Sequence, residues 1–173
     1  KPDEMPGDAP IRFQKLPIVE ATDFSGWEQV SSTMAPLYKT DGLIDPNGPI
    51  APEIAKIMAA GTDPVARAAA ALRLVQDKIR YQAITLGTGN YVPQTPAETW
   101  SLRYGDCKAK TLLLLAILRQ MGIDAEPVLA SAKLGGLVSS RLPSAGAFDH
   151  IFVKATVNGR TLWLDGKIGR AHV

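Results

Sequence analysis

The dipeptide Asn158-Gly159 lies between two runs in which apolar and more polar residues alternate, and this arrangement strongly limits the possible folds. Both residues adopt positive φ readily, and this dipeptide is the strongest short signal for a two-residue β-hairpin turn. Such a turn pairs Val157 with Arg160 and thereby fixes every other pair along the two strands. In that register Asp165 lies opposite Phe152.

The predicted hairpin has one apolar face and one face that carries ionisable residues. Alternation places on the apolar face Ile151, Val153, Ala155, Val157, Leu162 and Leu164. His150 and Asp165 share the other face as diagonal neighbours, roughly 7–8 Å apart at the backbone. We therefore expect their side chains to come within hydrogen-bonding distance. Taken alone, such a pair favours a surface ion pair on a hairpin.

The other predicted elements place helices first and strands last. Helices are expected from Asp23 or Ser25 to about Tyr38, at 51–60, from Pro64 (capped by Asp63) to about Tyr81, from Pro96 to about Arg103, and at 107–121 before Gly122. A short strand is expected at 18–24, a short extended piece at 82–86, strands at 123–132, 147–157 and 160–165, and a flexible loop at 133–146. This order predicts an α+β fold.

Size and composition favour one domain with its own core. The 173 residues are 46% hydrophobic, which disfavours a disordered chain. Residues 1–17 contain four prolines and are predicted to form a loose N-terminal segment. We expect the domain at 18–166 and a foreign tail at 167–173. Because the chain begins with Lys1 rather than Met, we expect a processed protein or an excised piece.

Several classes of function are disfavoured by composition and motifs. The net charge of +2, with both signs interspersed, gives no clustered basic face for nucleic acid. One cysteine and two histidines cannot form a Cys/His zinc site, although a carboxylate-rich site stays open. The loop at 87–90 lacks the third glycine of a dinucleotide fingerprint. The apolar run at 112–118 is too short to span a bilayer. We expect no cofactor, no metal and no membrane insertion by this segment.

Cys107 stands at the first turn of a predicted helix, directly after Asp106. A helix N-terminus lowers the pKa of a thiol, and its free N–H groups can hold an oxyanion. Lys108 and Lys110 act in the same direction if they lie near the thiol. A buried structural cysteine is equally compatible with this position. The chain order Cys107, His150, Asp165 favours a thiol triad, in which the carboxylate orients the imidazole and the imidazole takes the thiol proton.

These residues lie in segments that resemble a known family. The stretch from Tyr104 to Lys110, with Phe148-Asp149-His150 and Trp163-Leu164-Asp165, resembles the bacterial transglutaminase-like superfamily of the papain-like cysteine protease clan. Trp27, Ile79-Arg80-Tyr81 and Pro93 are similar to a subgroup in which this core follows a β-rich domain of unknown function. The resemblance covers about residues 18–166. Ala109, Asp149 and Gly166-Lys167 depart from the subgroup's pattern.

The resemblance implies a fold and a set of site residues. The expected fold packs N-terminal helices on an antiparallel sheet, with the Cys107 helix buried centrally. It implies catalysis by Cys107, His150 and Asp165 without a cofactor. Gln82 or Gln94 would supply a second oxyanion donor, as a glutamine does in papain-like enzymes, and Trp100 would line the site. For each of these three residues, the alternative is an ordinary loop or surface side chain without a part in catalysis.

The resemblance also implies partners and leaves three functions open. It implies a peptide or protein substrate, neighbouring domains of a longer chain, and a periplasmic or extracytoplasmic location. Hydrolysis by a peptidase or amidase is favoured over cross-linking to an amine acceptor. A non-catalytic peptide-binding module of a larger envelope protein is the third alternative. We further expect rapid alkylation of Cys107 near neutral pH, and a mobile 133–146 loop beside the substrate groove.

Overall fold

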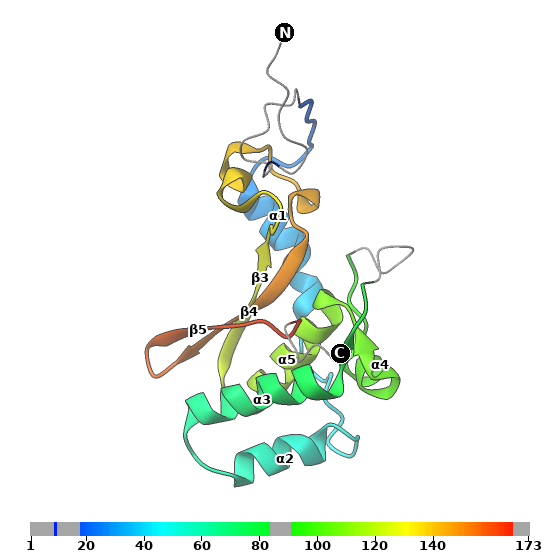
Figure 1. Ribbon diagram of the computed structural model, residues 1–173, viewed down its shortest axis with the longest axis vertical. Helices are drawn as coiled ribbons and strands as arrows, with labels where there is room; N and C mark the ends of the chain where they lie inside the picture. Colours follow the sequence, from blue (N-terminus) through cyan, green and yellow to red (C-terminus); the bar gives the residue numbers. More distant parts are fainter. Residues whose placement is uncertain (1–8, 10–17, 84–90, 168–173) are drawn as a thin grey trace.

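The computed structural model describes residue 9 and residues 18–83 and 91–167 (Figure 1). Its helices and strands form a mixed architecture in which a helix layer lies against an antiparallel sheet, so the predicted α+β class is confirmed. Among the described residues no helix is both long and apolar enough to cross a membrane.

Five α-helices are formed in the described part of the chain. They are α1 (Trp27–Met34), which continues as the 3-10 helix η2 (Ala35–Tyr38), α2 (Ala51–Ala59), α3 (Pro64–Lys78), α4 (Pro96–Leu102) and α5 (Cys107–Gln120). Local sequence explains their starts. The Asp63 carboxylate accepts hydrogen bonds from the first turn of α3, and Thr95 forms a capping box with Glu98 at α4.

The main sheet has three antiparallel strands in the order β3-β4-β5, namely β3 (Asp124–Ala130), β4 (His150–Val157) and β5 (Arg160–Leu164). A separate parallel pair joins β1 (Arg80–Tyr81) to β2 (Tyr104–Gly105). Because β4 is central, β3 and β5 are edge strands of the main sheet. The three strands that follow α5 lie in the segments where the sequence predicts strands.

The hairpin between β4 and β5 has the predicted register. Asn158 and Gly159 adopt φ of 50° and 72°, as a two-residue turn with two positive φ values requires, and Val157 pairs with Arg160. Ile151, Val153, Ala155 and Val157 are all nearly inaccessible to solvent. The apolar face of the hairpin therefore faces the core, as expected.

Helix α5 lies at the centre of the molecule. Its residues from 109 to 118 are all buried. One side of α5 packs on β3 and β4, and another packs on α3 and α4, while α2 packs on α3 (Figure 1). The predicted central position of this helix is confirmed. The N-terminal helices α3 and α4 pack chiefly on α5 rather than directly on the sheet, because α5 lies between them and the strands.

Several local predictions are wrong. Residues 18–24 form no strand, and α1 begins after Gly26 without a side-chain cap, so neither Asp23 nor Ser25 caps it. Helix α3 ends at Lys78 because Arg80 and Tyr81 pair with β2. The segment 133–146 is not wholly irregular, since it contains the 3-10 helices η4 (Gly135–Ser140) and η5 (Ala145–Ala147).

Some predictions lie outside the described residues. These are the loose segment at 1–17 except for residue 9, the extended piece at 84–86, the loop at 87–90, and the tail at 168–173. The division into a segment, a domain and a tail stays a prediction.

Candidate active site

Cys107 is the first residue of α5, and the turn that leads into this helix is tightly built. Asp106 is the N-cap, and its carboxylate accepts a hydrogen bond from the Ala109 N–H at 3.0 Å and pairs with the Lys108 ammonium. A Cβ at Gly105 would lie 2.8 Å from the Ala109 Cβ, so this position requires glycine. The local sequence therefore fixes Cys107 as the first residue of α5.

His150 and Asp165 are in direct contact, as the hairpin register predicts. The His150 Nε2 lies 2.7 Å from Asp165 Oδ2, and both side chains are largely shielded from solvent. The other carboxylate oxygen accepts the Lys167 N–H at 2.8 Å, and the Asp165 carbonyl accepts Gln76 Nε2 at 2.9 Å. Asp165 is thus held from three sides while it holds the imidazole.

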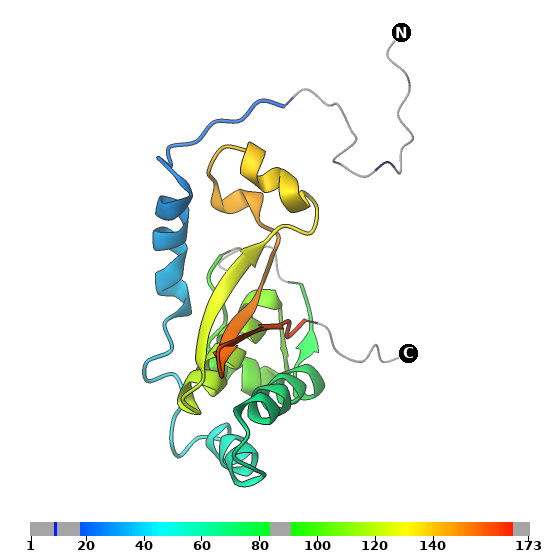
Figure 2. The same ribbon diagram turned by 90° about the vertical axis from the view of Figure 1, so that its left-hand side faces the viewer.

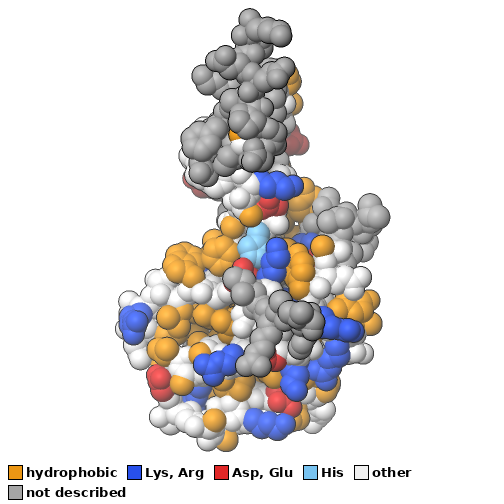
Figure 3. Space-filling view, in the orientation of Figure 1, with side chains coloured by type: hydrophobic (Ala, Val, Ile, Leu, Met, Phe, Trp, Pro, Cys, Tyr) orange, Lys and Arg blue, Asp and Glu red, His pale blue; other side chains and the backbone are white. Residues whose placement is uncertain are grey.

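Cys107 and His150 line one cavity of about 300 Å³. The Nδ1 atom of His150, which points away from the Asp165 contact, is buried and has no hydrogen-bond partner among the described residues. The histidine side chain, coloured pale blue, is visible at the surface between apolar and basic side chains (Figure 3). One ring nitrogen is therefore held by a carboxylate, and the other is left without a hydrogen-bond partner among the described residues.

The electrostatic surroundings of the thiol differ from those predicted. Burial and, next, the Asp106 carboxylate raise the pKa of Cys107 above its ordinary value. The Lys108 ammonium and the backbone N–H groups of Ile151 and Lys108 act in the opposite direction but do not outweigh them. The expected lowering of the thiol pKa by the helix start is therefore wrong for this resting site.

Lys110, which would lower the thiol pKa only if it lay near Cys107, turns its ammonium to a backbone carbonyl instead. Its side chain is 1% exposed, and its ammonium donates to the Ile79 carbonyl at 2.5 Å. Burial lowers the pKa of Lys110 to about 8, although the Asp165 carboxylate acts in the opposite direction. Lys110 thus interacts electrostatically with Asp165 from a buried position and is not part of the environment of Cys107.

The three predicted accessory residues do not line the cavity. Trp100 is 4% exposed and lies in the core, with the Arg103 guanidinium stacked 4.1 Å from the centre of its ring, so its predicted role is wrong. Gln82 is exposed, while its neighbours Tyr81 and Ala83 line the cavity, as alternation along an extended segment requires. Gln94 turns its amide oxygen towards Gly105 instead.

Tyr38 is the cavity residue that sequence reasoning missed. It is 2% exposed, and its hydroxyl has no hydrogen-bond partner among the described residues. Burial, together with the negative charges of Cys107 and Asp106, strongly raises the pKa of Tyr38. Its position comes from the packing of η2 beside α5. No local motif marks it, because Tyr38 is distant in sequence from the other residues of the site.

The segment 133–146 borders the site, as predicted. Ala145 and Gly146 line the cavity together with Asp149. Asp149, one of the departures from the subgroup's pattern, turns its carboxylate to the Ala132 N–H at 2.7 Å and so closes the base of this segment. The predicted mobility of the segment is not tested and stays a prediction. Within the described part of the chain, no group of three or more His, Cys, Asp or Glu residues could hold a metal ion.

Comparison with known protein families places this geometry in context. The family model described as the transglutaminase-like superfamily matches residues 53–163, which include both Cys107 and His150. The chain belongs to the transglutaminase-like superfamily. The resemblance that the sequence segments indicated is thereby confirmed. A search of curated protein sequences gave no significant match.

Two solved structures share the fold. One carries the name "putative protease" from Parabacteroides distasonis, with a TM-score of 0.58 and 16% identity, and the match covers 78% of this chain and 26% of that one. The other, a "putative cysteine protease" from Cytophaga hutchinsonii, has a TM-score of 0.53 and 14% identity, with 79% and 42% covered. This chain thus spans less than half the length of either neighbour. The chain thus shares its fold with these two proteins and its superfamily with transglutaminase-like proteins.

Proposed function

We propose that this domain hydrolyses amide bonds of peptides or proteins through a triad of Cys107, His150 and Asp165. The observation that carries the proposal is the histidine geometry. Asp165 holds Nε2 at 2.7 Å, while Nδ1 is buried without a partner among the described residues, and His150 lines the cavity that Cys107 also lines. The names of the two structural neighbours, which refer to proteases, support the same reaction class.

The acylation step follows from this arrangement. His150 Nδ1 takes the proton of the Cys107 thiol as the sulfur attacks the substrate carbonyl carbon, and Asp165 stabilises the resulting imidazolium. The Cys107 N–H, which precedes the first intrahelical hydrogen bond of α5, is the donor for the oxyanion. The imidazolium then gives its proton to the departing amine, the C–N bond breaks, and a thioester remains on Cys107.

Release of the acyl group repeats the sequence with water. His150 Nδ1 takes a proton from water as the water oxygen attacks the thioester carbonyl. The C–S bond then breaks, the thiolate regains a proton from the imidazolium, and a carboxylic acid leaves. No step requires a metal or an organic cofactor.

The raised pKa of Cys107 defines how the nucleophile is activated. Since burial and Asp106 favour the neutral thiol, the proton leaves during the attack rather than before it. His150 therefore acts as a general base towards a thiol, and activity depends on neutral His150. This mechanism predicts slow alkylation of the resting thiol near neutral pH, in contrast to the expectation from the helix start alone.

Charge in the cavity does not separate hydrolysis from amine transfer. Asp106 and Asp149 would attract a protonated amine, and Lys108 would repel it. We favour water as the acceptor because both named neighbours are described as proteases. A cross-linking reaction and a purely binding module are alternative outcomes of the test below. The extracytoplasmic location also remains a proposal from family resemblance.

The test is a mass measurement on the full 173-residue chain. A panel of peptide amides is added with and without a primary amine, the reaction is quenched with acid, and both the protein and the products are weighed. We expect the mass of an acyl group on Cys107 and free acid as the main product. Amine-linked product in excess of free acid at modest amine concentration would establish transfer instead.

Two variants make the assignment specific. Asp165→Asn should slow acylation strongly because it removes the charge that stabilises the imidazolium. Asp124→Asn, an exposed carboxylate on β3, serves as the matched control and should leave the rate unchanged. If neither acyl-protein nor product appears across the panel, the non-catalytic reading replaces this proposal.

A further inference from the structure

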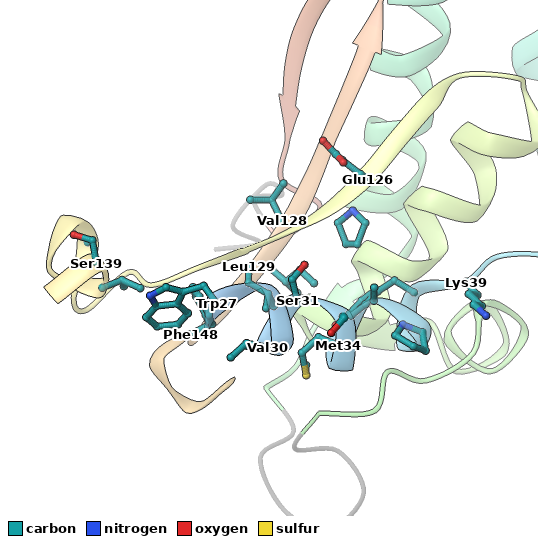
Figure 4. A pocket seen from close by; sticks show the side chains of 18 of the residues that line it. Trp27, Val30, Ser31, Met34, Lys39, Glu126, Val128, Leu129, Ser139 and Phe148 are labelled. Atoms are coloured by element: carbon teal, nitrogen blue, oxygen red, sulfur yellow. The ribbon is translucent and has the colours of Figure 1, made fainter. Parts of the chain in front are cut away.

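A second and larger cavity lies beside the proposed site. It has a volume of about 1310 Å³ and lies between α1 with η2 on one side and β3 on the other. Figure 2 shows α1 running alongside β3, with the η4 segment above one end. Figure 4 shows the side chains of α1 and β3 that border it. The proposed mechanism makes no use of this cavity.

The helix wall of the cavity is one face of α1. Trp27, Val30, Ser31 and Met34 line it with the spacing i, i+3, i+4 and i+7, which places them on a single face. Ser32 also lines the cavity, so three of the five lining side chains of α1 are apolar. The helix therefore turns a mainly apolar surface towards β3 rather than towards bulk solvent.

The opposite wall is the free edge of β3. The Ala130 carbonyl accepts a hydrogen bond from the Asp149 N–H and so points towards β4. Because backbone groups alternate along a strand, Ala125, Pro127 and Leu129 direct theirs away from β4. Pro127 has no N–H, whereas Leu129 presents both an N–H and a carbonyl. An extended peptide can pair with such an edge.

Both ends of the cavity are built from specific contacts. At one end Arg119 donates to the carbonyls of Ala125 and Tyr38, each at 3.0 Å. At the other end the rings of Trp27 and Phe148 meet edge to face, with centroids 5.6 Å apart. Since the Arg119 guanidinium is engaged by these carbonyls, the interior offers mainly apolar surface to a ligand.

The two cavities share a wall. Five residues line both of them, namely Met34, Tyr38, Leu129, Phe148 and Ile151. Four of the five are apolar. The fifth, Tyr38, contributes a buried hydroxyl without a partner among the described residues. A buried hydroxyl without a hydrogen-bond partner lowers the stability of the fold unless a ligand supplies that partner. A molecule that spans both cavities would give this hydroxyl a partner.

We propose that the α1–β3 cavity binds a bulky apolar side chain of the substrate peptide, with Tyr38 as the hydrogen donor to the peptide at the junction. The peptide backbone lies extended along the edge of β3, where Leu129 offers its N–H and carbonyl. This inference rests on the proposed function because it assigns the substrate class of the same site. It commits to a peptide with a large apolar residue next to the amide that reacts.

The test measures binding, so that it does not depend on turnover. The probe is a glutamine-centred pentapeptide amide with phenylalanine on both sides of the glutamine, and its analogue has glycine at both positions. Binding to the full 173-residue chain carrying Cys107→Ala is titrated by NMR. We expect the phenylalanine peptide to bind at least about tenfold more tightly, as burial of a large apolar side chain predicts.

Two matched variants locate the binding. Ser31→Phe fills the cavity from α1 and should bring the ratio of the affinities for the phenylalanine and glycine peptides close to one. Thr33→Phe adds the same ring to α1 at an exposed position outside the cavity lining and should retain the preference. Tyr38→Phe should weaken binding of the phenylalanine peptide several-fold, because it removes the hydroxyl while keeping the ring.

The outcomes separate the two proposals. Equal affinity for the two peptides, or a preference that survives Ser31→Phe, overturns the assignment of the cavity. A preference that Ser31→Phe removes, in a chain whose wild-type form turns over no peptide, supports the cavity and refutes the hydrolase. Turnover of peptides without any preference refutes the cavity alone.

Discussion

The two ends of helix α5 carry different kinds of residues. From Leu112 to Leu118 the helix is apolar on every side and forms the centre of the core. At its other end the N-cap Asp106 and the first-turn residue Lys110 are buried, while the proposed nucleophile, Cys107, is half-buried. One helix thus contributes to stability at one end and to the proposed chemistry at the other. Substitutions at the two ends should therefore affect different measurements.

The largest effect is expected from Cys107→Ala. Loss of the sulfur should reduce amide hydrolysis by at least about a thousandfold, as removal of a nucleophile does in comparable triads. The free energy of unfolding should change by about 1 kcal/mol or less, because the cavity is already partly open at this residue. Kinetic assays and urea unfolding of the same preparation provide the check. A large loss of stability would show that the first turn is structural after all.

Leu114→Ala tests the other end of the helix. Its side chain is completely buried, so truncation should lower the free energy of unfolding by about 3 kcal/mol, as in other cores. The turnover number of the chains that remain folded should stay near that of the wild type. Leu142→Ala, where the side chain is 44% exposed, is the control and should have little effect on either quantity. Loss of turnover in the folded fraction of Leu114→Ala would contradict the separation.

Lys110→Met probes the buried charge in the first turn through pH. Burial lowers the pKa of Lys110 from 10.5 to about 8, so below pH 8 the ammonium is charged in both states and its burial opposes folding. Between pH 8 and 10.5 the folded chain releases the proton while the unfolded chain keeps it, so this residue's contribution to stability rises with pH. The wild type should therefore gain up to about 3 kcal/mol relative to Lys110→Met across this interval.

The difference between the two proteins isolates this residue. Tyr38 and Cys107, whose pKa values are raised, lower the stability at high pH in both proteins and so cancel. Urea unfolding at several pH values gives the measurement. Lys78→Met, at an exposed position near the end of α3, is the control and should show no such trend. A difference that is constant with pH would mean that Lys110 is not buried as a charge.

The smallest effect is expected from Asp106→Asn. Asparagine caps a helix about as well as aspartate but loses the ion pair with Lys108, so the free energy of unfolding should fall by about 1 kcal/mol. The substitution removes the carboxylate that helps to raise the thiol pKa, while Lys108 remains. The pKa of Cys107 should therefore fall. The pH dependence of iodoacetamide labelling measures it, and an unchanged profile would show that burial alone sets the thiol pKa.

The sequence predicted the parts of the site that depend on local rules. The Asn158-Gly159 turn and strand alternation together predicted the contact between His150 and Asp165. The Asp106 cap and the glycine before it marked where α5 begins. These features depend on residues that are close in sequence, so that the geometry of one turn or one hairpin determines them.

The parts that the sequence did not predict depend on packing between distant segments. Tyr38 lines the site only because η2 packs beside α5. Trp100 does not line it, because α4 places that ring in the core. The pKa of Cys107 depends on how completely the surrounding elements exclude water, which no short motif reports. The burial of Lys110 likewise follows from the position of Ile79, which lies between α3 and β1.

The tight turn between β4 and β5 also bears on the order in which the chain assembles. His150 and Asp165 belong to one hairpin, and local hairpins form within about 1–10 μs. Cys107 meets them only after α5 and β3 have docked, which requires contacts between distant segments and is slower. During synthesis the thiol also leaves the ribosome before the histidine and the aspartate. The nascent chain therefore carries the cysteine before its proposed partners, and the proposed triad is complete only once the last strand has joined the sheet.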